Sequence, residues 1–289
     1  MAGSPIIWEL DFYSRPIFEE NGKKRWEVAI CETPLSARAD AAQGFRFAKY
    51  CPSTSVNSIW LKEALEEAIE KSGTKPTLIR FFRRQMNNMI LKASNDAGLV
   101  AKSSRRTATL SAWLEQRYAE VYPQAEGYKA SENPSVQYMP DPAMPLPDAL
   151  EGERWAFVSL QASDFAEMDE WEIGFGESFS LKGLLNPDQP VPGMLIFSKR
   201  ANPLAAWMSG LELAFLKFDG GPPTSMVLET GVSDRWLLAA INNKSTIEEA
   251  KAFETAKVAA NNVHFIGIQT SPEEEKFAGF WLLKELQLG

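Results

Sequence analysis

The chain has 289 residues, of which 45% are hydrophobic and 24% charged, so it can bury the core of one large domain or two smaller ones and is not a disordered chain. Its net charge of −8 excludes a surface that is basic throughout, and any site for a polyanion must be a local patch. Two cysteines, Cys31 and Cys51, exclude a disulfide framework, and the single histidine, His264, excludes a cluster of histidine metal ligands. We expect no metal and no cofactor.

From the first residues of the sequence we expect no targeting signal. The stretch from Ser4 to Glu9 lacks the charged start and the long apolar run of a signal peptide. The most apolar stretch, residues 203–218, includes Ser209, Glu212 and Lys217 and is too short and too polar to cross a bilayer. These observations predict a cytoplasmic protein without a membrane span.

The first half of the chain predicts a hairpin followed by helices. Residues 8–13 and 26–31 alternate apolar and polar side chains, as half-buried strands do, and Asn21-Gly22 between them favours a tight turn. Residues 57–71 repeat apolar side chains on one helical face, and Gly73 ends that helix. The pattern then predicts a strand over 77–82, a helix over 84–96 and a helix over 110–121.

A proline-rich stretch separates the two halves. Six prolines fall within residues 123–152, a density that disfavours both helix and central strand and predicts a linker. Residues 1–150 carry 19 basic and 18 acidic groups, whereas residues 151–289 carry 11 and 20, so the second half is strongly acidic. Beyond the linker the patterns predict strands over 154–160, 171–181 and 193–197, a hairpin over 226–229 and 235–241, a helix opened by the capping box of Ser245 and Glu248 and ending near 260, and final segments over 263–268 and 277–286.

Both halves contain a hairpin, a helix and a strand in that order. We therefore predict an α+β fold of two related mixed-sheet domains with flanking helices. The predicted domains are an N-terminal domain over 1–122, the linker over 123–152 and an acidic C-terminal domain over 153–289. A pair of degenerate restriction-endonuclease-like cores is the alternative fold.

Three carboxylates raise the alternative of a Mg²⁺-dependent nuclease. A hairpin that carries acidic residues and precedes a helix and a strand is the layout of restriction-endonuclease-like metal sites. Such sites also need a lysine two residues after the glutamate, to stabilise charge on the phosphate, and that position is Ala29. We therefore favour a strand face whose carboxylates pair with Arg15 and Arg25. The three carboxylates are Glu9 and Asp11 on the first strand and Glu27 on its partner.

A basic segment covers residues 80–106. If residues 84–96 form a helix, Arg84, Asn88 and Lys92 share the face opposite its apolar side chains. Arginine and lysine bind phosphates, and asparagine reads base edges. The segment is typical of an RNA site, and a solvated helix face neutralised by the acidic second half is the alternative. Its basic residues are Arg80, Arg83, Arg84, Lys92, Lys102, Arg105 and Arg106, against Asp96 alone.

Two further features near the C-terminus have structural interpretations. His264 alternates with Ile266 on a predicted strand, so we interpret it as a hydrogen-bonded core histidine. The tripeptide Trp281-Leu282-Leu283 is typical of a buried segment, although a tryptophan this close to the chain end is also a candidate for an exposed platform on which an RNA base stacks.

Four strings of the sequence together resemble one family. They are WELDFYSRP over 8–16, KRWEV over 24–28, RFFRRQM over 80–86 and GFWLL over 279–283. The chain resembles the Tab-type RNA-binding family of chloroplasts and cyanobacteria, named for translation of the photosystem I psaB message, and the resemblance runs through both halves.

The resemblance implies a single-stranded RNA-binding protein that acts on the 5′ untranslated regions of photosystem subunit messages, without catalysis and in a cyanobacterial cytoplasm. The resemblance further implies that the protein promotes the translation of these messages and photosystem biogenesis, with other translation or assembly factors as further partners. In that family the C-terminal Trp-Leu-Leu is associated with RNA binding. A protein-interaction scaffold for photosystem assembly, with the acidic half as its docking surface, is the alternative function. The predicted RNA-binding residues are Arg80, Arg83, Arg84, Asn88, Lys92, Arg105, Arg106, Trp281, Leu282 and Leu283.

Overall fold

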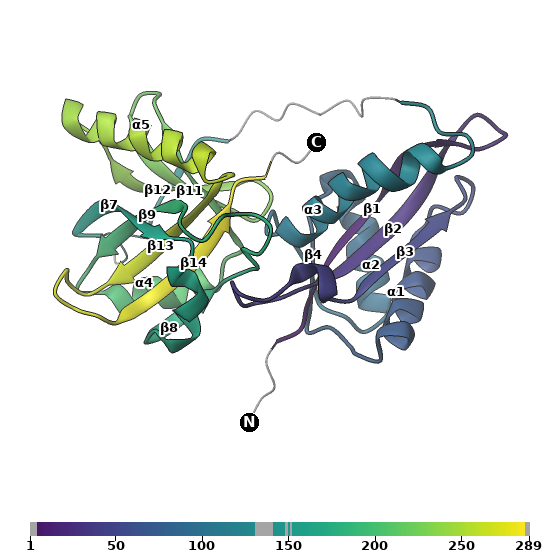
Figure 1. Ribbon diagram of the computed structural model, residues 1–289, viewed down its shortest axis with the longest axis horizontal. Helices are drawn as coiled ribbons and strands as arrows, with labels where there is room; N and C mark the ends of the chain where they lie inside the picture. The colour runs from purple at the N-terminus through teal and green to yellow at the C-terminus, as the bar shows by residue number, and fades with distance from the viewer. Residues whose placement is uncertain (1–4, 131–140, 148–149, 151, 287–289) are drawn as a thin grey trace. The chain divides into compact units, whose positions relative to one another are not determined.

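The computed structural model describes residues 5–130, 141–147, 150 and 152–286, whose contacts divide into two units (Figure 1). The first unit holds the described residues of Met1–Pro34 and Ala41–Gln137, and the second holds those of Leu35–Asp40 and Tyr138–Leu286. Sheets and helices occur in both units, so the predicted α+β class is confirmed. No helix within these described stretches is long and apolar enough to cross a membrane.

The first unit is built on one mixed sheet of five strands in the order β3-β2-β1-β4-β5. The predicted hairpin is confirmed, because β1 (Ile7–Phe18) pairs antiparallel with β2 (Lys24–Thr33) and Gly22 has a φ of 76° in the turn. β4 (Leu78–Phe81) runs parallel to β1, and β5 (Ala101–Ser103) runs parallel to β4. The sequence patterns missed β5 and the edge strand β3 (Arg46–Cys51).

Three helices flank this sheet. α1 (Ser58–Ser72) confirms the first predicted helix: the side chain of Asn57 accepts two backbone N–H groups of its first turn, and Gly73 ends it in the left-handed conformation. The helix predicted over 84–96 begins as a 3₁₀ turn at Arg84–Met86 and continues as α2 (Asn87–Asp96). α3 (Ala108–Gln116) widens into a π-helical turn at Arg117–Val121.

The two faces of the sheet in the first unit differ in chemistry. One face packs its aromatic and aliphatic side chains against α1 and α2 in the main core of the unit. On the opposite face Ala29 and Cys31 lie beneath α3 with its buried Leu110, Trp113 and Leu114. Because side chains alternate along a strand, this second face also receives the charged residues of β1. The buried charged residues of the unit are Glu9, Asp11, Arg15, Glu27 and Arg80.

The second unit contains two mixed sheets. Their strand orders are β10-β11-β12-β6 and β7-β9-β13-β14-β8. The predicted strands and hairpin of this half are confirmed, with the strand predicted over 171–181 limited to β8, whereas β6 and β10 were not predicted. The strands are β6 (Met144–Pro145), β7 (Arg154–Gln161), β8 (Ile173–Glu177), β9 (Pro190–Phe197), β10 (Leu213–Asp219), β11 (Ser225–Thr230), β12 (Asp234–Ala240), β13 (Val263–Gln269) and β14 (Phe277–Lys284).

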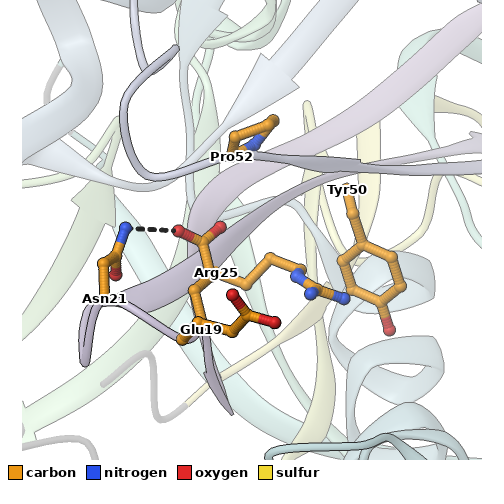
Figure 2. A pocket seen from close by; sticks show the side chains of 6 residues that line it. Glu19, Asn21, Arg25, Tyr50 and Pro52 are labelled. Carbon is orange, nitrogen blue, oxygen red and sulfur yellow. Dashed lines mark hydrogen bonds between the residues drawn. The ribbon is translucent and has the colours of Figure 1, made fainter.

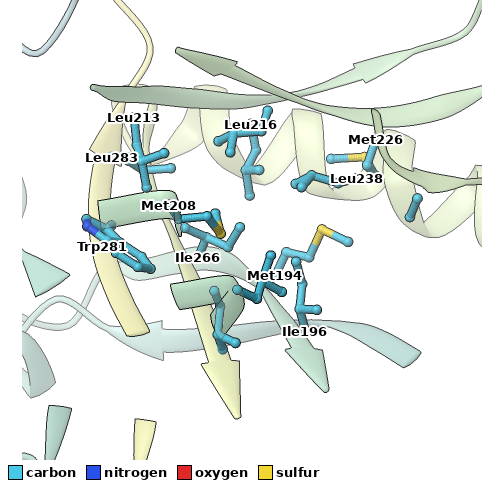
Figure 3. Close-up of a cluster of buried hydrophobic side chains, with 14 of the residues drawn as sticks. Met194, Ile196, Met208, Leu213, Leu216, Met226, Leu238, Ile266, Trp281 and Leu283 are labelled. Carbon is cyan, nitrogen blue, oxygen red and sulfur yellow. The ribbon is translucent and has the colours of Figure 1, made fainter. Parts of the chain in front are cut away.

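The core of the second unit lies between its sheets and two helices, α4 (Ala201–Ser209) and α5 (Lys244–Ala259). Figure 3 shows Met194 and Ile266 from one sheet facing Leu216 and Met226 from the other. The capping box predicted at Ser245 is wrong: the N-cap of α5 is Asn243, whose side-chain oxygen accepts the backbone N–H of Thr246 at 2.9 Å.

The two units share an element order but pair their strands differently. In the first unit the strand after the hairpin and helix, β4, joins the sheet of its own hairpin, whereas in the second unit β13 joins the other sheet. The described ends of the predicted linker are also paired. Lys129 donates its backbone N–H to Pro16, and β6 lies beside β12. Residues 131–140, 148–149 and 151 of the linker lie outside the described part of the chain, and the domain boundaries at 122 and 153 stay a prediction.

Residues 35–40 belong to the second unit although both flanking segments belong to the first. Ser178 and Ser180 donate their hydroxyls to the backbone oxygens of Leu35 and Ala39, both at 2.6 Å. Arg38 adds an ion pair with Asp169 at 3.0 Å. These bonds hold the segment against the chain on both sides of β8.

Candidate functional site

The basic segment splits into two loops at one end of the first sheet. β4 and β5 are parallel neighbours, with Phe81 in register with Ser103, so the loops that follow them begin side by side. The backbone N–H of Ser104 donates to Phe81 at 2.8 Å and its hydroxyl accepts the N–H of Arg106 at 3.1 Å, which fixes the second loop. The carboxyl ends of parallel strands are common places for ligands. This end of the sheet is therefore the candidate site.

Two of the predicted RNA-binding arginines turn inward. Arg80 is 4% exposed and lies on β4 in register with Glu9. The Nε of Arg83 donates to Asp11 at 2.8 Å, and the guanidinium lies 4.0 Å from the ring centroid of Tyr13. Arg83 therefore neutralises a buried carboxylate, and its side chain is only 10% exposed.

The other basic residues of the segment face outward to different degrees. Asn88 and Lys92 are exposed on α2, opposite the buried Ile90, as the helical pattern predicts. Lys92 forms an ion pair with Asp96 at 2.9 Å, one turn along the helix. Three arginines of the two loops, Arg84, Arg105 and Arg106, are half-buried, and Lys102 on β5 is exposed. The arginines of the two loops follow the ends of neighbouring strands, and Asn88 and Lys92 lie on the helix that begins after the first loop.

A buried ionic network fills the space between the sheet and α3. Arg15 is fully buried; its Nη1 donates to Asp11 and its Nε donates to Glu27, both at 2.9 Å. Burial alone would raise the pKa of Asp11, but Arg15 and Arg83 outweigh it and hold that pKa below its ordinary value. Glu27 also accepts from Arg117 and from the Tyr122 hydroxyl.

This network bears on the nuclease alternative. Asp11 and Glu27 each accept from two arginines, so their oxygens are directed at guanidinium groups rather than at a shared metal position. The partner predicted for them, Arg15, is confirmed, whereas Arg25 instead lies 5.6 Å from the ring of Tyr50. The described residues contain no cluster of three carboxylate, cysteine or histidine side chains able to hold a metal.

Glu9 has a separate role in the same layer. Its two oxygens accept the Thr33 hydroxyl and the backbone N–H of Leu110, both at 2.6 Å, and Leu110 lies in the first turn of α3. The carboxylate thus caps the helix start and ties it to the sheet. Burial raises the pKa of Glu9 to about 7, although Thr33, Leu110 and the positive charges of Arg80 and Arg106 act against that shift.

The Trp-Leu-Leu tripeptide is a buried part of β14. Trp281 is 4% exposed and, together with Leu283, packs in the main core of the second unit (Figure 3). Leu282 is fully buried on the opposite face of the strand. Of the two roles left open by the sequence, this placement favours support of the fold over base stacking.

His264 is the hydrogen-bonded core histidine that we predicted. It is fully buried, its Nε2 accepts the backbone N–H of Leu216 at 2.8 Å, and its Nδ1 lies 3.0 Å from the backbone oxygen of Asn262. Burial, aided by the charge of Lys257, lowers its pKa well below the ordinary value. The Nε2 can accept this bond only in the neutral ring, so His264 is a fixed structural group.

In the first unit, a shallow hollow lies at the end of the sheet where the turn between β1 and β2 is found (Figure 2). It exposes the ring of Tyr50 beside the guanidinium of Arg25, a combination that the sequence patterns did not single out. Glu19 also lines it and is held by Ser53. With Glu20 the hollow has two carboxylates for one arginine, so it matches a phosphate chain poorly.

Sequence reasoning missed the residues that organise the site from within. Glu9 as a helix cap and Arg117 as a partner of Glu27 depend on contacts across 101 and 90 residues of chain. The sequence feature that could have indicated these contacts is the row of charged residues on β1. This strand is central, because it has neighbouring strands on both sides. A charged row on a central strand requires buried partners.

Comparisons with known proteins assign the chain to a family. The family model described as RNA-binding protein Tab2/Atab2 N terminal matches residues 7–117, and the model described as RNA-binding protein Tab2/Atab2, C-terminal domain, matches residues 133–284. A relative from Zea mays, "Protein TAB2 homolog, chloroplastic", is 38% identical over 287 residues, which cover 96% of this chain and 71% of the relative. A protein of the same name from Arabidopsis thaliana is 36% identical over 294 residues, 99% of this chain and 76% of its own length.

No solved structure matches the chain significantly. The two family models nevertheless cover segments of both units, and the two plant relatives align with nearly the whole chain. The chain belongs to the Tab2/Atab2 family of RNA-binding proteins.

Proposed function

We propose that this protein binds single-stranded RNA in the 5′ untranslated regions of photosystem messages and promotes their translation, without catalysis. The observation that carries the proposal is the match of both RNA-binding family models, together with two basic loops that leave adjacent parallel strands at one sheet end. Photosystem messages, photosystem biogenesis, other translation or assembly factors and the cyanobacterial cytoplasm follow from the resemblance of the four sequence strings to the Tab-type family. The acidic second unit confines the phosphate contacts to this local patch.

The predicted residues divide into contacts and supports. Asn88, Lys92, Arg84, Arg105 and Arg106 face outward enough to reach RNA, and Lys102 joins them on β5. In the proposal these groups bind phosphates, with Asn88 available to a base edge. Arg83 pairs with the buried Asp11, the positive charge of Arg80 acts on the buried Glu9, and the buried Trp281, Leu282 and Leu283 support the second unit.

Binding is tested by fluorescence anisotropy with labelled photosystem leader RNA and a scrambled RNA of equal length, at several salt concentrations. We expect preference for the leader and affinity that falls with salt. The same RNA, incubated with Mg²⁺ and re-examined on a gel, should stay intact. Cleavage that Asp11→Asn abolishes would instead support the nuclease alternative, and equal weak binding of both RNAs would reject the proposal.

A matched pair of variants tests the assigned surface. Lys92→Gln with Lys102→Gln should weaken RNA binding and reduce the slope of log affinity against log salt by about 0.7 for each lost phosphate contact. The control is Lys62→Gln with Lys71→Gln on α1, where both lysines form exposed ion pairs one helical turn apart with glutamates. If the control pair reduces the slope equally, RNA contacts another surface.

A further inference from the structure

Aromatic side chains cover one face of the five-stranded sheet in the second unit. The ring of Phe265 lies directly over Gly193, where a Cβ atom would come within 2.3 Å of it, and Phe277 lies over Gly267 at 3.2 Å by the same measure. Trp171, from the turn before β8, packs edge-to-face against Phe280, with ring centroids 5.3 Å apart. Glycines in the strands thus let large rings lie flat on the sheet.

A groove of about 740 Å³ opens beside this aromatic face. Its apolar part consists of Leu160, Trp171 and Phe277, all half-buried. Its rim is acidic, and Lys276, the basic residue that lines it, forms an ion pair with Glu172. The rim glutamates are Glu170, Glu172, Glu273, Glu274 and Glu275.

The walls of the groove are fixed by backbone bonds. The N–H of Phe277 donates to the backbone oxygen of Glu172 at 3.0 Å, which joins the two acidic segments. The side chain of Gln269 donates to the backbone oxygen of Glu274 at 2.7 Å. The glutamates are therefore presented on a formed loop, and a ligand need not order the loop on binding.

We propose that this groove binds a lysine- and arginine-rich peptide segment of another protein, with an apolar side chain of that segment seated on Trp171 and Phe277. The charge of the groove favours a cationic peptide over RNA as its ligand. Five glutamates against one paired lysine attract a cationic chain and repel the phosphates of RNA. Half-buried aromatic rings supply the contact area that a surface of carboxylates alone lacks. The site is independent of the proposed RNA surface, which lies in the first unit.

The experiment uses the full chain and two labelled peptides of about 12 residues, long enough to cross such a groove in extended form. One peptide alternates leucine with lysine and the other alternates leucine with glutamate. Anisotropy should report binding of the basic peptide alone, weakened by salt.

Two variants with equal charge changes locate the binding. Glu274→Gln with Glu275→Gln should weaken binding of the basic peptide about fivefold, as expected for the loss of two exposed ion pairs. Glu248→Gln with Glu249→Gln removes the same charge from the exposed start of α5. This control should change the affinity for the basic peptide by less than about twofold, because salt screens charges that lie far from the ligand.

Further results decide between occupants. Equal loss in both double variants would show only a response to net charge and overturn the site. Binding of the acidic peptide would also overturn it. Thermal melts that coincide for all variants establish that each result refers to folded protein.

Discussion

At the scale of single residues, the first unit depends on carboxylates held away from water. Glu9 exchanges its hydration for two short hydrogen bonds, from Thr33 and from the first turn of α3. Those bonds do not fully replace water, because burial still raises the pKa of Glu9 from 4.5 to about 7. The folded state therefore binds a proton more tightly than the unfolded state does.

The pH dependence of stability follows from this shift. The stabilising effect of the raised pKa is fully present below about pH 4.5 and is lost as the pH rises through 7, on the order of 3 kcal/mol in total. Glu9→Gln, which keeps the shape and cannot ionise, should flatten this dependence. Hydrogen exchange of α3, followed from pH 5 to 8 and corrected for the intrinsic rate, measures it.

The second unit provides an internal control for this measurement. The pKa of His264 is lowered by burial and by Lys257, so its effect has the opposite sign: stability is present above about pH 6.5 and is lost at lower pH. Exchange in β13 should therefore become faster toward acid, and Glu9→Gln should not alter it. Loss of α3 protection at high pH in the variant as well would show that another group is responsible.

Arg83 gives a second prediction at the residue scale. Its removal leaves the buried Asp11 with Arg15 alone, so Arg83→Ala should destabilise the first unit by about 3 kcal/mol, measured by urea unfolding. RNA affinity of the protein that remains folded should change little, because the guanidinium is engaged inside. A variant of normal stability that no longer binds RNA would place Arg83 among the contacts.

At the scale of elements, β14 shows how a buried strand can influence binding without touching RNA. Trp281→Ala removes a large side chain from the main core of the second unit and should cost about 3–5 kcal/mol of stability. We expect RNA affinity to fall only at temperatures where that unit unfolds. Thermal melts and anisotropy over the same temperatures check this. Trp281→Phe should retain part of the stability and part of the RNA affinity that Trp281→Ala loses. Loss of affinity far below the melting temperature would favour base stacking.

Elements with strong local signals could be predicted from the sequence. The Asn21-Gly22 turn joins two alternating strands, and Gly73 ends a helix with an apolar face, so residues a few positions apart determine these structures. β5 has only three residues, too few for a period, and β3 is an edge strand whose exposed Ala48 and Tyr50 obscure the alternation. The N-cap of α5 lies two residues before the predicted Ser245, because Asn243 is also a favourable N-cap residue for the same helix start.

The candidate site was harder to predict for a related reason. The basic segment could be recognised from its composition, but the direction of each side chain depends on distant partners. Arg83 turns inward because Asp11, 72 residues earlier, is buried beside it. Outward groups such as Asn88 and Lys92 follow from helical periodicity alone.

At the scale of the whole molecule, charge separates two surfaces. The proposed RNA surface belongs to the first unit, where the basic loops are gathered, and the acidic groove belongs to the second. A chain with a net charge of −8 can therefore present a local cationic surface to RNA and an anionic surface to a protein. The two proposals are tested with different ligands and with variants in different units.

The short segment over 35–40 affects how the protein can be divided. The second unit takes this piece of chain from within the sequence of the first, so neither unit is one continuous stretch. A gene truncated within the linker would yield an N-terminal fragment with an unsupported loop and a C-terminal fragment lacking the partners of Ser178 and Ser180. Recombinant fragments should therefore be made by co-expression of both pieces, or by grafting a copy of residues 35–40 onto the second fragment.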